Sequence, residues 1–210
     1  MKTEQYWIDQ FTGLGALWIH DDNPKRPHTL LTSGNHSGGF FNASRVIEHP
    51  LLLAEACVDM VEKDNLIKEF FPDVVIGSAL GAITIAHEIG RHLGVRSGFT
   101  EPVVDGNEKR MMLKRFNVSG AEVLVVEDII TTGGTTKKTI TSIKEQGGMV
   151  LPFVFALVNR SGNSKLGEKT ISALIDYPMP IWKPSDCPLC KVGSQIVRPK
   201  DNWDLLTREY

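Results

Sequence analysis

The middle of the chain alternates between apolar runs and segments of helical character. Several runs are rich in Val, Ile and Leu and lack the polar alternation of a half-exposed strand. Such runs predict strands that are covered on both faces, as in a parallel sheet with crossover helices. The pattern therefore predicts the α/β class with a doubly wound, mainly parallel sheet. Strands are predicted at residues 73–77, 95–101, 122–127 and 150–158, and helices at residues 82–93 and 135–146.

The segments outside this alternation differ in pattern. Residues 51–71 carry apolar positions at roughly helical spacing and stop at Pro72, which predicts one helix. Residues 1–50 are interrupted by prolines and a glycine-rich run, so they predict an irregular capping or mobile segment and not a core element. The polar, basic stretch at 103–115 predicts a long exposed loop or ribbon of the kind that serves as a lid.

Composition narrows the classes of function. The 210 residues, 41% of them hydrophobic, can bury one substantial core. A net charge of −2 with mixed signs provides no continuous positive surface for nucleic acid. No apolar stretch approaches the roughly 20 residues of a membrane span, no secretory leader is evident, and three cysteines make no disulfide framework. We therefore expect a cytoplasmic protein that binds neither nucleic acid nor membrane.

The most informative segment runs from Val123 to Thr136. An apolar strand delivers Glu127 and Asp128 to its carboxyl end, and a turn of small and hydroxyl residues then begins a helix. Helix amino termini present unpaired N–H groups and partial positive charge, and ligands of open α/β sheets bind outside the carboxyl ends of the strands. The turn therefore predicts a site for a phosphate monoester. Two adjacent carboxylates beside it fit a sugar phosphate, whose hydroxyls would donate hydrogen bonds to them.

Two other phosphate motifs do not fit this segment. A triphosphate-binding P-loop requires the spacing GxxxxGK followed by Ser or Thr, which does not occur in the chain. A dinucleotide fingerprint requires GxGxxG, and the adjacent Gly133 and Gly134 do not supply it. A sugar phosphate is therefore the ligand class that the segment favours.

The strand, the acidic pair and the turn Thr131-Thr132-Gly133-Gly134-Thr135 together resemble the motif of type I phosphoribosyltransferases that binds 5-phosphoribosyl 1-diphosphate (PRPP). The resemblance implies the fold of that family with a small hood formed by both ends of the chain. We expect a hood segment at residues 1–50, a core at 51–170 and a carboxyl-terminal segment at 171–210 that completes both. The resemblance also implies a homodimer and Mg²⁺ as cofactor, held mainly through PRPP and not by metal ligands of the protein.

The same resemblance assigns a PRPP site residue by residue. The acidic pair would bind the ribose hydroxyls, the following turn would bind the 5-phosphate, and the small-residue turn at 77–82 is similar to the pyrophosphate loop of the family. A basic residue of the 103–115 loop, in this family supplied by the neighbouring subunit, would act on pyrophosphate. The implied catalytic residues are Glu127, Asp128, Lys109 and Arg110. The implied PRPP-binding residues are Glu127, Asp128, Ile129, Ile130, Thr131, Thr132, Gly133, Gly134, Thr135, Ala79, Leu80, Gly81, Lys114 and Arg115.

Other segments are similar to the orotate phosphoribosyltransferases within this family. Leu31 to Gly34 with Phe40, Phe41 and Asn42 resembles their hood, in which the Phe-Phe-Asn backbone touches the orotate ring. Arg160 resembles the arginine that pairs with the orotate carboxylate, a bidentate match, and Thr131 is expected to touch orotate too. The chain departs from the family pattern at Thr32, where many members carry lysine, and at Asn159, where aspartate is usual.

The implied reaction is transfer of the 5-phosphoribosyl group from PRPP to orotate, giving orotidine 5′-phosphate and pyrophosphate in pyrimidine biosynthesis. Its transition state is a cation-like ribosyl centre that must be shielded from water, and no covalent nucleophile is required. The departures leave two alternatives open: a phosphoribosyltransferase for another base, and a PRPP-binding regulator without turnover.

Two further groups of residues, outside this site, could bind a metal or contact the substrate. Cys187 and Cys190 have the spacing of half a zinc knuckle, and a metal site there would need ligands from elsewhere in the chain or from a partner chain. His28 and His36 lie in the expected hood, where they could meet substrate. Loop histidines are more often solvated, and we expect these two to be solvated.

Overall fold

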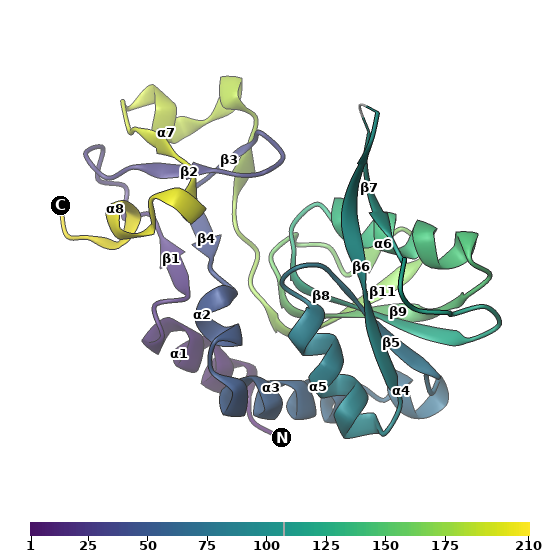
Figure 1. The fold of residues 1–210 in the computed structure, drawn as a ribbon. Helices are drawn as coiled ribbons and strands as arrows, with labels where there is room; N and C mark the ends of the chain where they lie inside the picture. Colours follow the sequence, from purple (N-terminus) through teal and green to yellow (C-terminus); the bar gives the residue numbers. More distant parts are fainter. Residues whose placement is uncertain (107) are drawn as a thin grey trace.

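The computed structural model describes residues 1–106 and 108–210; Asn107, which falls within the predicted 103–115 loop, lies outside the described residues. Within that part of the chain, seven strands form a central sheet in the order β10-β11-β9-β8-β5-β6-β7. Figure 1 shows this sheet in one half of the molecule and the hood strands β1 to β4 in the other half, with α1 and α3 along the lower side. None of the helices in the described residues is both long and apolar enough to span a membrane.

The inner strands of the sheet pair in parallel, and antiparallel strands close its two edges. The crossover helices occur where the sequence predicts them, so the prediction of an α/β fold with a mainly parallel sheet is confirmed. β11 was not predicted as a separate strand. The parallel strands are β5 (Val74–Ser78), β6 (Arg96–Asp105), β8 (Glu122–Ile130), β9 (Met149–Asn159) and β11 (Lys169–Asp176), and the crossover helices are α5 (Ile83–Leu93) and α6 (Gly134–Glu145).

β8 is buried on both faces because its side chains alternate between two apolar clusters. Leu124 and Val126 belong to the larger cluster, which includes residues of α3 and α5. Val123 and Val125 belong to a second cluster, which includes Ile143 of α6. This two-sided burial is why the strand reads as a continuous apolar run.

The prediction that residues 1–50 are irregular and outside the core was wrong. Trp7 and Phe11 of α1 are fully buried in the same cluster as the sheet, and the Trp7 indole donates to Asp59 Oδ2 at 3.0 Å. Trp7 and Phe11 are the two buried residues of a ten-residue helix, which is too few to produce a clear helical period. The observed elements are α1 (Glu4–Gly13), β1 (Leu17–Ile19), β2 (His28–Leu30), β3 (His36–Ser37), β4 (Gly39–Phe41) and α2 (Ser44–Ile47).

The single helix predicted at 51–71 is two helices, α3 (Pro50–Lys63) and α4 (Leu66–Glu69). Asp64 causes the break, because its Oδ1 accepts a hydrogen bond from the Leu66 N–H at 2.8 Å. A local side-chain acceptor of this kind offers the backbone an alternative to continuing the helix.

The stretch predicted as a loop or ribbon is an antiparallel hairpin. β7 (Glu108–Met112) pairs with the outer part of β6, which runs four residues further than the predicted strand end at Glu101. Figure 1 shows this hairpin projecting upward from the half of the molecule that holds the central sheet. The ribbon prediction is confirmed, and the role of a lid stays a prediction.

Both ends of the chain build the hood, as expected. One small sheet has the order β12-β3-β2-β13, and β1 pairs with β4. The Trp18 indole donates to the carbonyl of Leu206 at 2.9 Å, which ties the last helix to β1. The remaining elements are β10 (Lys165–Leu166), β12 (Ile181–Trp182), the 3-10 turn Pro184–Asp186, α7 (Pro188–Lys191), β13 (Ile196–Val197), the 3-10 turn Pro199–Asp201 and α8 (Trp203–Thr207).

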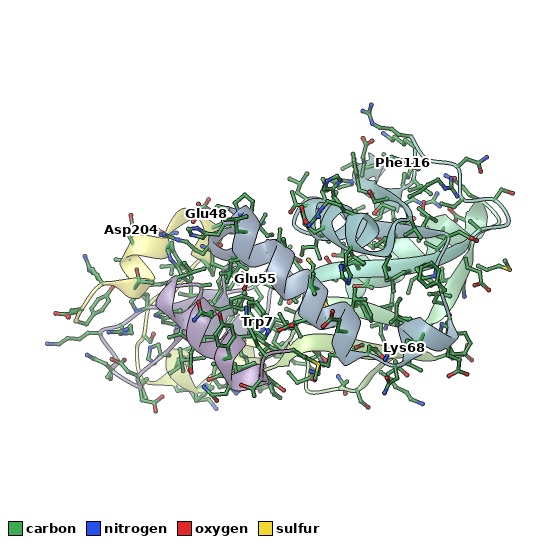
Figure 2. The ribbon with its side chains drawn as sticks, turned by 90° about the horizontal axis from the view of Figure 1, so that it is seen from below. Trp7, Glu48, Glu55, Lys68, Phe116 and Asp204 are labelled. Carbon is green, nitrogen blue, oxygen red and sulfur yellow. The ribbon has the colours of Figure 1, made fainter. Side chains whose placement is uncertain are left out.

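Replacing Trp7 tests whether α1 belongs to the core. Figure 2 shows α1 beside α3, with Trp7 and Glu55 labelled on these helices. We expect Trp7→Ala to lower the free energy of unfolding by about 3–5 kcal/mol, because a large buried side chain leaves a cavity and Asp59 loses a donor. Urea unfolding measures the change. The matched control is Gln5→Ala on the exposed side of α1, for which we expect a change within about 0.5 kcal/mol.

Candidate active site

The acidic pair lies at the carboxyl edge of the sheet, where the sequence predicts it. β5 pairs with β8 only as far as Gly77 opposite Val126, whereas β9 pairs with β8 up to Asn159 opposite Ile130. Glu127 and Asp128 therefore follow directly after the point where β5 ends. In open parallel sheets this edge is where ligands bind.

The turn after β8 presents polar groups at the amino end of the twelve-residue helix α6. Thr132, Gly134 and Thr135 are exposed, and Thr131 is half-buried. The helix is capped by Gly133, whose φ of +70° and whose approach to Leu166 admit no side chain: an added Cβ would lie 2.1 Å from Leu166 Cδ1. The first N–H groups of α6 have no partner within the helix, so the turn has the donors that a phosphate requires.

The two acids differ in environment. Glu127 is 5% exposed, and its carboxylate accepts the Thr136 hydroxyl at 2.9 Å and the Asp128 N–H at 3.3 Å. Burial, together with the neighbouring charge of Asp128, raises the pKa of Glu127 well above its ordinary value of 4.5. Asp128 is half-buried and accepts the N–H of Ile129 at 2.7 Å. Among the ion pairs of the described residues, none involves either acid, so Asp128 is free to accept hydrogen bonds from a ligand.

The turn predicted as a pyrophosphate loop lies directly against the acidic pair. A Cβ built on Gly81 would lie 1.9 Å from Asp128 Oδ2, so the glycine is what allows the loop backbone to approach that carboxylate. A Cβ on Gly77 would lie 2.2 Å from the carbonyl oxygen of Ala82. Ala79 is half-buried and Leu80 is 78% exposed. Two predicted PRPP-binding segments that are distant in the sequence therefore meet.

Arg160 connects the phosphate turn, residues 131–135 after β8, to the hood. Its backbone N–H donates to the carbonyl of Ile130 at 2.9 Å, and its Nη2 donates to Ser37 Oγ at 2.8 Å and to the carbonyl of Gly39 at 3.1 Å. Arg160 is 1% exposed, and its Nε has no hydrogen-bond partner among the residues that the structure describes. Burial lowers the pKa of Arg160 to about 10, so the guanidinium stays charged at neutral pH. It has no carboxylate partner within the described residues.

Asn159, which stands where the family usually has aspartate, is required by its neighbours. Its amide donates to Asp176 Oδ1 at 2.8 Å and to the carbonyl of Asn163 at 2.9 Å, and its oxygen accepts from Ser161. A carboxylate in this position would repel Asp176 and could donate to neither oxygen. The departure from the family pattern therefore has a local structural reason.

The hood aromatics use their side chains for packing. Phe41 is 3% exposed and contacts Phe11, with ring centroids 5.5 Å apart. Phe40 packs on Trp203 of α8, with centroids 5.8 Å apart. The Phe41 side chain is therefore not available for the predicted contact with a base ring, whereas Phe40 is half-buried. Because Gly39 of the same strand accepts from Arg160, the hood strand does lie beside the end of β9.

The structure does not bring the predicted loop cations to the acidic pair within one chain. Arg110 pairs with Glu145 at the carboxyl end of α6 at 2.8 Å, and Arg115 pairs with Glu101 at 2.7 Å. Lys109 and Lys114 are exposed. Among the described residues, none of the four makes a hydrogen bond or ion pair with the acids or with residues 131–135.

A buried hydroxyl network beneath the site was not predicted from the sequence. Thr139 Oγ1 of α6 lies 3.0 Å from Ser78 Oγ and 2.9 Å from Thr100 Oγ1, so it joins the end of β5 and the middle of β6 to the helix. Thr136, one turn earlier, holds Glu127. The available signal was the presence of hydroxyl residues at strand ends and on the inner face of the helix.

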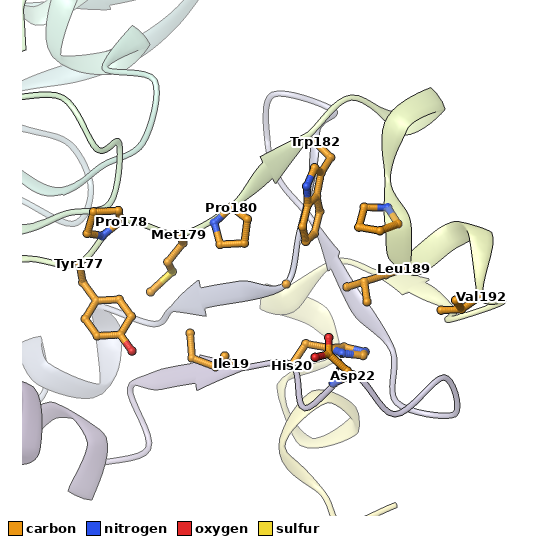
Figure 3. Close-up of a pocket in the computed structure, with 12 residues that line it drawn as sticks. Ile19, His20, Asp22, Tyr177, Pro178, Met179, Pro180, Trp182, Leu189 and Val192 are labelled. Carbon is orange, nitrogen blue, oxygen red and sulfur yellow. Dashed lines mark hydrogen bonds between the residues drawn. The ribbon is translucent and has the colours of Figure 1, made fainter.

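A pocket of about 500 Å³ lies in the hood, away from the phosphate turn (Figure 3). Its wall is largely apolar and includes Ile19, Met179, Trp182 and Leu189. None of the predicted site residues is among its described lining residues. The pocket adjoins Arg160 through Met179, whose N–H donates to the Arg160 carbonyl at 3.2 Å, and through Gly38, which lies between the two residues that the Arg160 side chain binds.

The family model and the similar proteins both indicate a phosphoribosyltransferase. Residues 52–171 match the phosphoribosyl transferase domain family. Orotate phosphoribosyltransferase of Desulforamulus reducens is 38% identical over 194 residues, covering 91% of this chain and 94% of that protein. The same enzyme of Acidithiobacillus ferrooxidans is 37% identical over 188 residues, covering 88% and 93%. The chain belongs to the orotate phosphoribosyltransferase family.

Solved structures of phosphoribosyltransferases share the fold of this family member. The crystal structure of orotate phosphoribosyltransferase from Aeropyrum pernix has a TM-score of 0.64 at 21% identity, covering 80% of this chain and 92% of that one. Leishmania donovani UMP synthase has a TM-score of 0.62 at 16% identity, covering 83% of this chain and 36% of that one. The predicted resemblance to type I phosphoribosyltransferases is thereby confirmed.

Glu127 gives a pH-dependent prediction for this phosphoribosyltransferase. Its folded-state pKa is raised, so the folded chain holds a proton that the unfolded chain releases, and stability falls as the pH rises from about 4.5 through the raised value. We expect Glu127→Gln to be more stable than wild type at about pH 8 and to lose this advantage near pH 4. Urea unfolding across this range measures it. Glu122→Gln, exposed at the other end of β8, should track wild type; a Glu127 variant that loses stability at pH 8 would contradict the assignment.

Proposed function

We propose that this chain transfers the 5-phosphoribosyl group from PRPP to orotate, giving orotidine 5′-phosphate and pyrophosphate in pyrimidine biosynthesis. The observation that carries the proposal is the meeting of three segments at the end of β8. Asp128 lies against Gly81 of the predicted pyrophosphate loop, and the amino end of α6 follows the same acids. The proposal is further supported by relatives named orotate phosphoribosyltransferase, which match this chain over most of both lengths.

The substrate PRPP would lie across these three segments. The N–H groups and hydroxyls of residues 131–135 would hold the 5-phosphate at the helix amino terminus. Asp128, half-buried and without an ion pair in the described part of the chain, would accept hydrogen bonds from the ribose hydroxyls. Glu127 would support it from below, because Glu127 is buried and already bound by Thr136. The backbone of Ala79, Leu80 and Gly81 would approach the diphosphate.

The acidic pair also fits the expected cofactor. Asp128 is half-buried and has no ion-pair partner among the described residues, and a carboxylate oxygen of this kind suits a hydrated Mg²⁺. When bound, Mg²⁺ would neutralise charge on the diphosphate and ribose oxygens. The protein would contact it mainly through PRPP, with Asp128 as the nearest oxygen ligand of the chain.

Arg160 is proposed to select the base. A buried guanidinium without a carboxylate partner is costly, and an anionic ligand would offset that cost. Orotate carries a planar carboxylate that a guanidinium can bind with two parallel hydrogen bonds. Its binding would exchange the contacts of Arg160 with Ser37 and Gly39 for contacts with substrate, and Thr131 would lie beside the same ring.

The hairpin cations are proposed to act on a second subunit of a homodimer. The hairpin projects upward from the sheet half of the molecule (Figure 1), and the four basic residues at 109–115 make no hydrogen bond or ion pair with the acids of that chain within the described residues. Lys109 and Lys114 are exposed and therefore available to a neighbouring site. A cation there would stabilise departing pyrophosphate, and the hairpin would help to exclude water from the ribosyl centre.

Replacing Asp128 tests the reaction. With PRPP, Mg²⁺ and orotate, we expect Asp128→Asn to lower the rate of pyrophosphate release by about 100-fold or more, because the ribose hydroxyls lose a charged acceptor. Circular dichroism and urea unfolding should show an intact fold. Glu122→Gln, on the same strand but at the opposite end, should keep wild-type activity. Near-normal turnover of the Asp128 variant would contradict the assigned role.

A substrate panel separates the proposed function from its alternatives. Orotate, uracil, hypoxanthine and xanthine are each supplied with PRPP and Mg²⁺, and pyrophosphate release is followed. Release with orotate alone is expected. Release with a different base would identify a transferase for that base, and tight PRPP binding without release would support a regulator.

Mixing two inactive variants tests whether the hairpin acts across a dimer. Asp128→Asn is combined with a double variant, Lys109→Ala with Lys114→Ala, after reversible dissociation. If the hairpin serves the partner's site, each mixed dimer has one site with both defects and one intact site, and random mixing restores about a quarter of wild-type activity. If it serves its own site, mixing restores nothing. If other cations do this work, the double variant is active by itself. Each variant mixed with itself is the control.

A further inference from the structure

Four side chains that can bind a metal converge in the hood, outside the proposed active site. His28 and His36 come from β2 and β3, and Cys187 and Cys190 come from the start and the body of α7. One ligand atom of each lies within 4.8 Å of the other three. The prediction that these histidines are solvated was wrong, because His28 is 0% and His36 is 7% exposed. The cysteine pair, which lacks ligands nearby in the sequence, acquires them from strands at the other end of the chain.

The distances between these atoms are those of a tetrahedral centre. His28 Nε2 lies 3.3 Å from His36 Nδ1, 3.5 Å from Cys187 Sγ and 3.4 Å from Cys190 Sγ, and Cys190 Sγ lies 3.3 Å from His36 Nδ1. Zinc bonds of about 2.0–2.1 Å to nitrogen and 2.3 Å to sulfur at tetrahedral angles place nitrogens about 3.3 Å apart and nitrogen and sulfur about 3.6 Å apart. The cluster matches this spacing with its present backbone.

A second layer of contacts orients His28. Ser194 Oγ donates to the carbonyl of Arg26 at 2.7 Å, so its lone pair is left to accept the Nδ1–H of His28 at 2.9 Å. The neutral ring therefore carries its hydrogen on Nδ1 and presents the bare Nε2 to the cluster. The lone pair of His28 Nε2 then faces two thiols and a nitrogen of His36. One lone pair cannot accept good hydrogen bonds from all three groups, whereas a cation at the centre can bind all four atoms. An outer acceptor that fixes the tautomer in this way is usual for metal-binding histidines.

We propose that His28, His36, Cys187 and Cys190 bind one structural zinc ion. Two thiolates and two imidazoles in tetrahedral arrangement favour zinc over the oxygen-preferring Mg²⁺ and Ca²⁺. Four protein ligands leave no position open for substrate, so the site is structural and not catalytic. The two cysteines are not joined in a disulfide, so both thiols are available as ligands.

The zinc would hold the two ends of the chain together beside the base site. Its ligands join the β2–β3 hairpin to α7, which lie more than a hundred residues apart in the sequence. Ser37 follows His36 directly and accepts from Arg160. Fixing His36 therefore fixes the hood strand that Arg160 contacts. This inference stands on the hood geometry alone and does not depend on the proposed reaction.

Metal analysis of the full-length, untagged chain tests the proposal. Purified under reducing conditions and dialysed, it should hold about one zinc per chain, measured by mass spectrometry of the metal. Replacing zinc with Co²⁺ should give the visible absorption of a tetrahedral cobalt site together with thiolate charge-transfer bands. Removal with a chelator should lower the melting temperature, and Zn²⁺ but not Mg²⁺ should restore it.

Matched variants assign the ligands. Cys190→Ser and His36→Gln should each lose most of the bound zinc. In the cobalt form, Cys190→Ser should lose thiolate charge-transfer absorption, and His36→Gln should lose the visible bands of a tetrahedral site. Cys57→Ala, in the helical core, and His87→Gln, exposed on α5, should each keep about one zinc per chain. The proposal is overturned if the wild-type chain binds no zinc when Zn²⁺ is supplied, if zinc persists in both ligand variants, or if Cys187 and Cys190 form a disulfide in the freshly purified protein. The wild-type measurements decide the matter even if a ligand variant does not fold.

Discussion

Two adjacent carboxylates at the end of a strand buried on both faces are the constraint around which this molecule is organised. Such a pair repels itself and is expensive to bury, so each acid must be held by its surroundings. Thr136 holds Glu127 from α6, and Gly81 leaves space for Asp128. The phosphate turn, the small-residue loop and the hydroxyl network of Thr139 all take their positions relative to this pair.

The parts of the fold and of the site that are local in sequence could be predicted from sequence. The core strands, the crossover helices and the turn after Ile130 each carry their signal within about a dozen residues, because apolar runs and glycine placement report on their immediate surroundings. The turn at residues 131–135 was therefore found by residue type alone, at the sheet edge where ligands bind.

The parts that depend on distant contacts could not be predicted. α1 buries only Trp7 and Phe11, so its contribution to the core gives no clear periodicity. The burial of Arg160 depends on two hood residues more than a hundred positions earlier in the chain. The four-residue cluster of the hood is divided between the two ends, so the spacing of Cys187 and Cys190 shows only half of it.

Because the hood contains strands from both ends of the chain, it has a consequence for folding during translation. β13 pairs with β2, and the Trp18 indole binds the carbonyl of Leu206. During translation β2 and β3 can pair with each other at once, but they must wait for β13 and β12 until the parallel sheet between them in the sequence has been synthesised. The hood therefore closes last, after all the strands of the central sheet have become available.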